Sequence, residues 1–160
     1  MEKILEDTKK EILKQTKNVE LIFVSGSYAF GTMQKYSDID MKVLTGTKPK
    51  KHRAFRFVEF DDRRILLTIH FDRLSHVLRE IRSPKEWVWD YEYYRRAVVL
   101  FDRNQNLEKI KEELEKHRVH SEYFHRFIPE EASYLPEYIG KLKNAYSEKD
   151  ELNILYAART

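Results

Sequence analysis

The pattern of apolar and polar positions predicts short strands in the first two thirds of the chain. An apolar run at residues 21–24 has the length of a buried strand. Residues 37–43 alternate polar and apolar side chains, as a strand with one buried face does. Two further strand patterns, at residues 54–60 and 64–71, are joined by a short polar turn, and a short apolar strand is predicted at residues 97–101.

Helical periodicity occupies most of the chain between and after these strands. Helices are predicted at residues 2–15, 75–82, 84–96, 107–119, 135–146 and 149–158. Strands that alternate with helices favour an α/β fold. We therefore expect a mixed sheet flanked by helices over residues 1–103, followed by a C-terminal helical region over residues 104–160.

Composition limits the class of protein. The 160 residues include no cysteine, which excludes disulfides, thiolate metal sites and cysteine nucleophiles. We expect a cytoplasmic protein, because no apolar run reaches the length of a membrane span and the N-terminus lacks the apolar core of a signal peptide. The net charge of +3 is too small to argue for nucleic acid by itself. The abundance of Lys, Arg and Glu is typical of thermophile proteins.

Asp38 and Asp40 carry the most specific chemistry in the sequence. Because successive side chains of a strand point to opposite faces, Asp38, Asp40 and Lys42 are expected to share one face. Two neighbouring carboxylates repel each other, and a divalent cation such as Mg²⁺, which binds carboxylates together with substrate phosphates, removes that repulsion. The turn at Gly26 and Ser27 can offer backbone N–H groups and a hydroxyl to a phosphate. The pattern therefore predicts a site for a metal-bound triphosphate.

This arrangement resembles a known family. Gly26-Ser27, ten residues and then Asp38-Ile39-Asp40 is similar to the GS-x10-DxD signature of the nucleotidyltransferase superfamily. That superfamily includes DNA polymerase β, the CCA-adding enzymes, the aminoglycoside nucleotidyltransferases and the minimal nucleotidyltransferase proteins. The resemblance is sharp over residues 24–43 and extends in pattern over residues 19–101. It implies a polymerase β-like fold and transfer of a nucleoside monophosphate from an NTP, with ATP expected, to an acceptor hydroxyl.

The resemblance also implies roles for individual residues. Asp38 and Asp40 are expected to be catalytic and to hold Mg²⁺ or Mn²⁺, and Gly26 and Ser27 are expected to hold the terminal phosphates. Lys42 is expected either to contact a phosphate or to neutralise Asp40. The acceptor stays open between a small molecule, a protein and RNA, because fold does not fix substrate.

The main departure from the family pattern is at Thr68. The family carries a third carboxylate on a later strand, and the alignment of residues 67–71 puts Thr68 at that position. A hydroxyl can neither neutralise Mg²⁺ nor act as a general base. Asp72, Glu59 and His70 are the candidates to replace the missing acid. The alternative interpretations are a half-buried strand histidine for His70 and a helix cap for Asp72.

The missing acid also supports a second hypothesis, of a different functional class. The chain would be a catalytically weak binding module of a two-component toxin–antitoxin assembly, in which a minimal nucleotidyltransferase pairs with a helical HEPN-type partner. The aromatic helix around Trp87 to Tyr94 is then either core packing or an interface with that partner or a second copy. The helical pattern is still present at residues 157–160, and we expect either a truncated chain or a last helix that packs on a partner.

A lysine-rich loop is predicted at residues 46–52. Lys48, Lys50 and Lys51 either form a solvated loop or reach a triphosphate or RNA.

Overall fold

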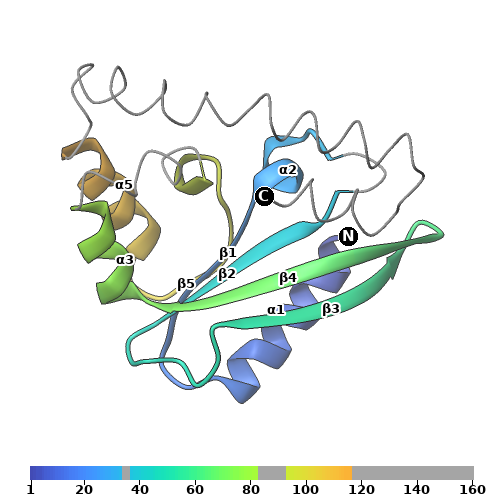
Figure 1. The fold of residues 1–160 in the computed structure, drawn as a ribbon, viewed down its shortest axis with the longest axis horizontal. Helices are drawn as coiled ribbons and strands as arrows, with labels where there is room; N and C mark the ends of the chain where they lie inside the picture. Colours follow the sequence, from blue (N-terminus) through green and yellow to red (C-terminus); the bar gives the residue numbers. More distant parts are fainter. Residues whose placement is uncertain (34–36, 83–92, 117–160) are drawn as a thin grey trace, which may run out of the picture. The chain divides into compact units, whose positions relative to one another are not determined.

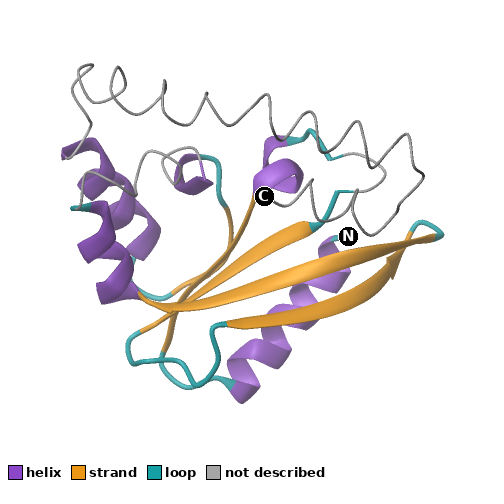
Figure 2. Ribbon diagram, in the orientation of Figure 1, coloured by secondary structure: helices purple, strands orange, loops and turns teal. Residues whose placement is uncertain are grey.

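The computed structural model describes residues 1–33, 37–82 and 93–116, and these residues form a five-stranded sheet with helices packed on it (Figures 1 and 2). The strands are β1 (Val19–Ser25), β2 (Ile39–Thr45), β3 (Arg53–Phe60), β4 (Arg63–Arg73) and β5 (Val98–Asp102). Their order across the sheet is β3-β4-β2-β1-β5. β2 and β4 are parallel and the other neighbouring pairs are antiparallel, so the expected mixed sheet is confirmed.

Four described helices flank the sheet. They are α1 (Glu2–Gln15), α2 (Gly26–Phe30), α3 (Leu74–Ile81) and α5 (Asn106–Lys116). Figure 1 shows α1 on one side of the sheet and α2, α3 and α5 on the other. None of the helices in these described residues is long and apolar enough to cross a bilayer.

The hydrophobic core lies between α1 and the sheet. Leu5 and Ile12 of α1 pack in one buried cluster with every second residue of the central strands, which are Ile22, Val24, Ile39, Met41, Val43, Ile65, Leu67, Ile69 and Phe71. An ion pair of 2.8 Å between Arg56 and Glu11 adds a polar tie between β3 and α1. The period of two in the strand sequences thus assigns one face of the sheet to α1 and leaves the other residues of β2 and β4 on the opposite face.

The observed elements agree closely with the sequence predictions. The first helix has the predicted bounds, and the hairpin of β3 and β4 turns at Asp61 and Asp62, both with positive φ as a two-residue hairpin turn requires. One prediction is wrong: β2 begins at Ile39 and not at residue 37, so Asp38 directly precedes the strand and does not lie on it. Of the predicted aromatic helix, residues 84–92 lie outside the described residues, as do the predicted helices at 135–146 and 149–158.

The chain divides into two compact units, residues 1–118 and residues 119–160. α5 belongs to the first unit, where it contacts α3 and β1. The helix α5 therefore lies in the same unit as the sheet, whereas the predicted boundary after residue 103 assigned it to the C-terminal region.

Candidate active site

A row of four side chains crosses the sheet on the face that α1 does not cover. Asp40 of β2 pairs in register with Ser25 of β1 on one side and with Thr68 of β4 on the other, and Thr68 pairs with Phe55 of β3. Paired residues project from the same face of a sheet, so these side chains are neighbours. Asp40 therefore stands near the middle of the sheet, between a buried serine and a buried threonine.

A second row follows two residues further along β2. Lys42 pairs with Phe23 of β1 and with His70 of β4, and His70 pairs with Arg53 of β3. The second row thus places three basic side chains beside the row that contains Asp40.

Gly26 packs directly against the carboxylate of Asp40. Gly26 has φ +68°, in the left-handed region that favours glycine, and a Cβ added there would lie 3.1 Å from Oδ2 of Asp40. Both the backbone conformation and the close contact therefore require glycine. The structure brings the Gly26–Ser27 turn and Asp40 together, as the sequence spacing predicts.

The environment of Asp40 disfavours its charged form. Burial raises its pKa from 3.8 to about 6, with a further contribution from the neighbouring charge of Asp38, while Arg53 lowers it. Asp38 itself is exposed. The two carboxylates are thus close enough to repel each other, and one of them is largely removed from water, which is the electrostatic problem that a divalent cation solves.

His70 lies beside Asp40 on the neighbouring strand. Its Nε2 lies 3.9 Å from Oδ1 of Asp40, which is beyond hydrogen-bond distance. Burial lowers the pKa of His70, and the positive charges of Arg53 and Lys42 lower it further, against the opposing effect of Asp38. His70 is therefore neutral at pH 7 and keeps a free lone pair for a proton.

Lys42 is held by two tyrosines. Its Nζ donates a hydrogen bond of 2.9 Å to the hydroxyl of Tyr94 and lies 5.5 Å and 5.1 Å from the ring centroids of Tyr93 and Tyr94. No ion pair between Lys42 and Asp40 exists in the described part of the chain, and Arg53 is the cation that lowers the pKa of Asp40. The expectation that Lys42 neutralises Asp40 is therefore not what the structure shows.

Two of the three candidates for the role of the missing acid lie away from Asp40. Asp72 is four residues along β4 from Thr68, a separation of about 13 Å. Glu59 is displaced along β3 by the same number of residues from the Asp40 row. Of the three candidates, the structure brings only His70 next to Asp40.

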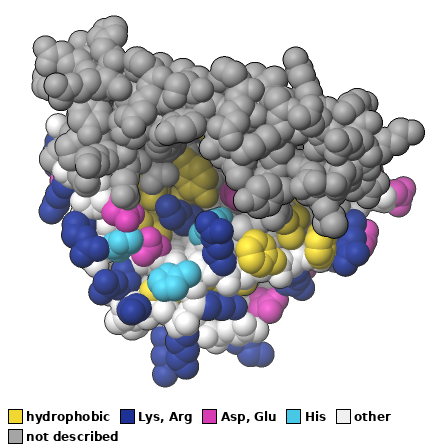
Figure 3. Space-filling view, viewed as in Figure 1, with side chains coloured by type: hydrophobic (Ala, Val, Ile, Leu, Met, Phe, Trp, Pro, Cys, Tyr) yellow, Lys and Arg dark blue, Asp and Glu magenta, His cyan; other side chains and the backbone are white. Residues whose placement is uncertain are grey.

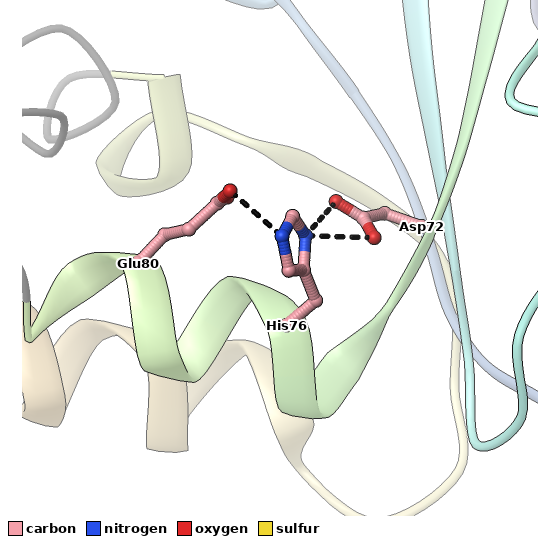
Figure 4. Close-up of side chains that lie close together, drawn as sticks. All are labelled: Asp72, His76 and Glu80. Carbon is pink, nitrogen blue, oxygen red and sulfur yellow. Dashed lines mark hydrogen bonds and ion pairs between the residues drawn. The ribbon is translucent and has the colours of Figure 1, made fainter.

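Asp72 instead begins a chain of close side-chain contacts along α3 (Figure 4). Nδ1 of His76 lies 2.9 Å from a carboxylate oxygen of Asp72, and Nε2 lies 2.9 Å from Glu80. Asp72 also accepts a 2.7 Å hydrogen bond from the backbone N–H of Arg73, at the start of the helix. The helical spacing of Asp72, His76 and Glu80, four residues apart, is a sequence signal that would have revealed this cluster.

These three residues are also of the types that bind divalent metals, and one ligand atom from each lies within 4.8 Å of the others. However, each imidazole nitrogen of His76 already contacts a carboxylate, so a metal ion could enter only by replacing one of those contacts. The cluster, as it stands, ties the end of β4 to α3.

The lysine-rich loop lies at the far end of β2 from Asp40. The loop follows Thr45, five residues after Asp40, which corresponds to about 17 Å along the strand. Lys48, Lys50 and Lys51 line a cavity of about 450 Å³ that also includes residues of the C-terminal end of α1. These lysines therefore line a cavity at the opposite end of β2 from Asp40.

The residues around Asp40 fit a metal-bound phosphate group. Asp38 and Asp40 are oxygen ligands of the type that Mg²⁺ and Mn²⁺ prefer. The hydroxyl of Ser25, on the same face, is buried and has no hydrogen-bond partner in the described residues. Sequence reasoning missed Ser25, Arg53 and Tyr94, because their roles depend on cross-strand register and on a contact between residues 52 positions apart.

Comparison with known families decides the relationship. Residues 7–106 match the family model described as polymerase beta, nucleotidyltransferase. The chain belongs to this family. The predicted membership in the nucleotidyltransferases and the polymerase β-like fold are thus confirmed. No curated protein matches the chain.

Two solved structures match the chain at low sequence identity. A nucleotidyltransferase-like protein from Exiguobacterium sibiricum shares 14% identity and a TM-score of 0.42, over 96% of this chain and 52% of that protein. A structure described as a toxin-antitoxin with AMP-PNP shares 16% identity and a TM-score of 0.44, over 84% of this chain and 98% of that chain. The chain thus spans about half the length of the Exiguobacterium protein.

Proposed function

We propose that this nucleotidyltransferase domain transfers a nucleoside monophosphate from an NTP, with ATP as the expected nucleotide, to an acceptor hydroxyl, in a reaction that depends on Mg²⁺ or Mn²⁺. The observation that carries the proposal is the raised pKa of Asp40 beside Asp38, at the point where Gly26 contacts its carboxylate. A half-buried carboxylate beside a second carboxylate costs folding free energy, and a bound metal nucleotide would remove that cost and so bind more tightly.

In this proposal Asp38 and Asp40 hold the metal, and Gly26 and Ser27 hold the terminal phosphates. A bound metal would neutralise negative charge on the triphosphate during substitution at the α-phosphorus. The acceptor oxygen forms a bond to the α-phosphorus, pyrophosphate leaves, and the hydroxyl proton passes to a base. Lys42, fixed by Tyr94, supplies a positive charge on the same face.

We assign His70 as the general base that takes the proton of the acceptor hydroxyl. It is adjacent to Asp40, and its lowered pKa keeps it unprotonated at pH 7. A positioned general base contributes about two to four orders of magnitude to rate, so His70→Gln is expected to slow transfer by about 100-fold or more while leaving NTP binding intact.

Thr68 favours a second candidate function, a module that binds NTP without efficient transfer. Thr68 occupies the strand position next to Asp40 and is buried, so a hydroxyl stands where the resemblance implies the third acid. Such a module would serve within a two-component assembly with a protein partner. Installing the acid as Thr68→Asp is expected to raise metal affinity and any residual transfer rate.

Binding and transfer are tested separately. Thermal unfolding is followed with and without Mg²⁺ and a non-hydrolysable ATP analogue, because a ligand that binds the folded state raises the melting temperature. Transfer is followed with α-labelled ATP and candidate acceptors of each class, including the protein itself. Binding with transfer supports the enzyme, and binding without transfer in both the wild type and Thr68→Asp supports the module.

The matched variants are Asp38→Asn with Asp40→Asn, and Asp61→Asn with Asp62→Asn. The second pair also removes two carboxylates, but in the β3–β4 turn, whose positive φ values asparagine accepts. Only the first pair is expected to abolish the metal-dependent rise in melting temperature. An equal rise in both variants would show that the nucleotide binds elsewhere.

A further inference from the structure

Two phenylalanines project from β3 into solvent on the face that carries Asp40. The side chains of Phe55 and Phe57 are 60% and 57% exposed, the highest values among the large hydrophobic residues described. Phe55 belongs to the Asp40 row, separated from it by Thr68. Neighbouring exposed apolar side chains, unlike single ones, are typical of interaction surfaces.

Basic side chains surround these rings. The guanidinium of Arg64 lies over the ring of Phe57, 4.2 Å from its centroid, and Arg53 occupies the same face of β3 next to His70. Neither Arg53 nor Arg64 forms an ion pair within the described ranges, whereas Glu59 adds one carboxylate to this face. Figure 3 likewise shows apolar side chains exposed beside Lys, Arg and His side chains on the face in view.

The sequence of β3 follows the pattern of a strand that stacks nucleic-acid bases. In RRM modules one strand reads basic, Gly, aromatic, Gly or Ala, Phe, Val, any residue, aromatic, and its exposed aromatics stack on bases. β3 reads Arg-Ala-Phe-Arg-Phe-Val-Glu-Phe. The matching residues are Arg53, Phe55, Phe57, Val58 and Phe60, and the departures are Ala54 and Arg56.

The burial of β3 agrees with that pattern residue by residue. Phe55 and Phe57 are exposed, whereas Val58 is buried and Phe60 packs against the core. Arg56, which replaces a small residue of the pattern, turns to the other face, where it pairs with Glu11 of α1. The substitution therefore leaves the face with the two rings open.

We propose that β3 and β4 bind single-stranded nucleic acid, with bases stacked on Phe55 and Phe57 and phosphates near Arg53 and Arg64. Aromatic faces accept any base, and arginines beside them neutralise the backbone, so recognition is by strandedness more than by sequence. The proposal does not rest on the proposed transfer, because neither stacking nor phosphate neutralisation requires Asp38 or Asp40.

The test is fluorescence anisotropy of the full chain with labelled oligouridine and oligodeoxythymidine of about 12 nucleotides, within the usual site size of one such domain. EDTA is present and NTP is absent, so the carboxylate site contributes no metal-dependent binding. Phe55→Ala with Phe57→Ala is expected to weaken binding about tenfold or more. The tyrosine pair at the same positions, which keeps the rings, is expected to bind like the wild type.

The matched control is Val98→Ala with Val99→Ala, which trims two exposed apolar residues from the opposite edge strand β5. This variant is expected to bind like the wild type. Arg53→Gln and Arg64→Gln are each expected to reduce the slope of log affinity against log salt by about 1. Asp38→Asn with Asp40→Asn should keep full binding, which separates this proposal from the transfer reaction. A melting curve for each variant checks its fold.

Binding of the RNA oligomer, the DNA oligomer or both supports the proposal. A preference for one oligomer shows whether the surface favours ribose or deoxyribose. Three results overturn the proposal: no binding by the wild type, equal binding by the alanine pair at Phe55 and Phe57, or an equal loss in the β5 control. In the first case the exposed rings would be a contact for a protein.

Discussion

At the scale of single residues, the site is built from side chains whose surroundings oppose their charge. Asp40 is only about one third exposed, lies near a second carboxylate and has a raised pKa. Arg53 offsets part of that cost from the neighbouring row. The charge of Asp40 should therefore lower the stability of the ligand-free protein, and a variant without that charge should show by how much.

Asp40→Asn is expected to stabilise the metal-free protein at pH 7 by about 1–3 kcal/mol. The folded-state pKa of about 6 exceeds the ordinary 3.8, so the folded protein binds the proton more tightly than the unfolded chain does. The contribution of Asp40 is thus most favourable below pH 4 and is lost as the pH rises through 6. Urea unfolding across this pH range measures it, and a difference between variant and wild type that does not shrink toward pH 4 would contradict the assignment.

Gly26→Ala tests the contact between the turn and Asp40. The added Cβ meets Oδ2 of Asp40 at 3.1 Å, and the positive φ adds about 1–2 kcal/mol of backbone strain. Gly31→Ala is the matched control, because Gly31 has φ +70° but no atom within 4 Å of the added Cβ. Both variants should melt at lower temperature, but only Gly26→Ala should lose the metal-dependent stabilisation by the ATP analogue. Equal loss in both would mean that the contact is irrelevant to binding.

At the scale of elements, the length of β2 separates two charged regions. The carboxylates lie at the start of the strand and the lysine-rich loop follows its end. Sequence proximity alone left open whether the loop serves the triphosphate, because a loop can fold back. The pairing of β2 with both β1 and β4 keeps the strand extended, which places the start of the loop about 17 Å from Asp40.

Replacing Lys48, Lys50 and Lys51 by glutamine is expected to leave the affinity for the metal-bound ATP analogue unchanged within about twofold, because charges about 17 Å apart in water at physiological salt are largely screened. Isothermal titration measures the affinity. A tenfold or larger loss would show that the loop does contact the nucleotide. The Asp38→Asn variant provides the positive control for loss.

At the scale of the whole described fold, the two faces of the sheet have different roles. One face forms the core with α1, and the other carries the carboxylates, the basic row and the exposed rings. Changes in the core should therefore alter stability without altering the site.

Leu5→Ala is expected to lower the free energy of unfolding by about 2–5 kcal/mol, because Leu5 is 2% exposed and its removal leaves a cavity. Leu13→Ala, on the same helix but 37% exposed, should cost much less. Below the melting temperature of each variant, the affinity for the ATP analogue should equal that of the wild type. A changed affinity in Leu5→Ala would show that the two faces are coupled.

The sequence patterns predicted the elements better than the site. Period-two alternation grouped Asp40 with Lys42 and Thr68 with His70 within their own strands, because side-chain direction follows directly from position in a strand. The register of the paired strands β2 and β4 was needed to bring the two groups onto one face. The distance of Asp72 from Asp40 required the register between β2 and β4, which alternation does not contain. The hydrogen bond between Lys42 and Tyr94 joins residues 52 positions apart, so no local sequence pattern could reveal it.

The parallel pairing of β2 and β4 also bears on how the chain folds. β3 and β4 are joined by a two-residue turn and can pair early, whereas Ile39 meets Leu67 only after a longer segment of chain has closed on itself. Pairings of high sequence separation are slow to form. Asp40 and Thr68 meet across that pairing, so nucleotide-binding competence should develop in the last kinetic phase of refolding, after the hairpin has formed.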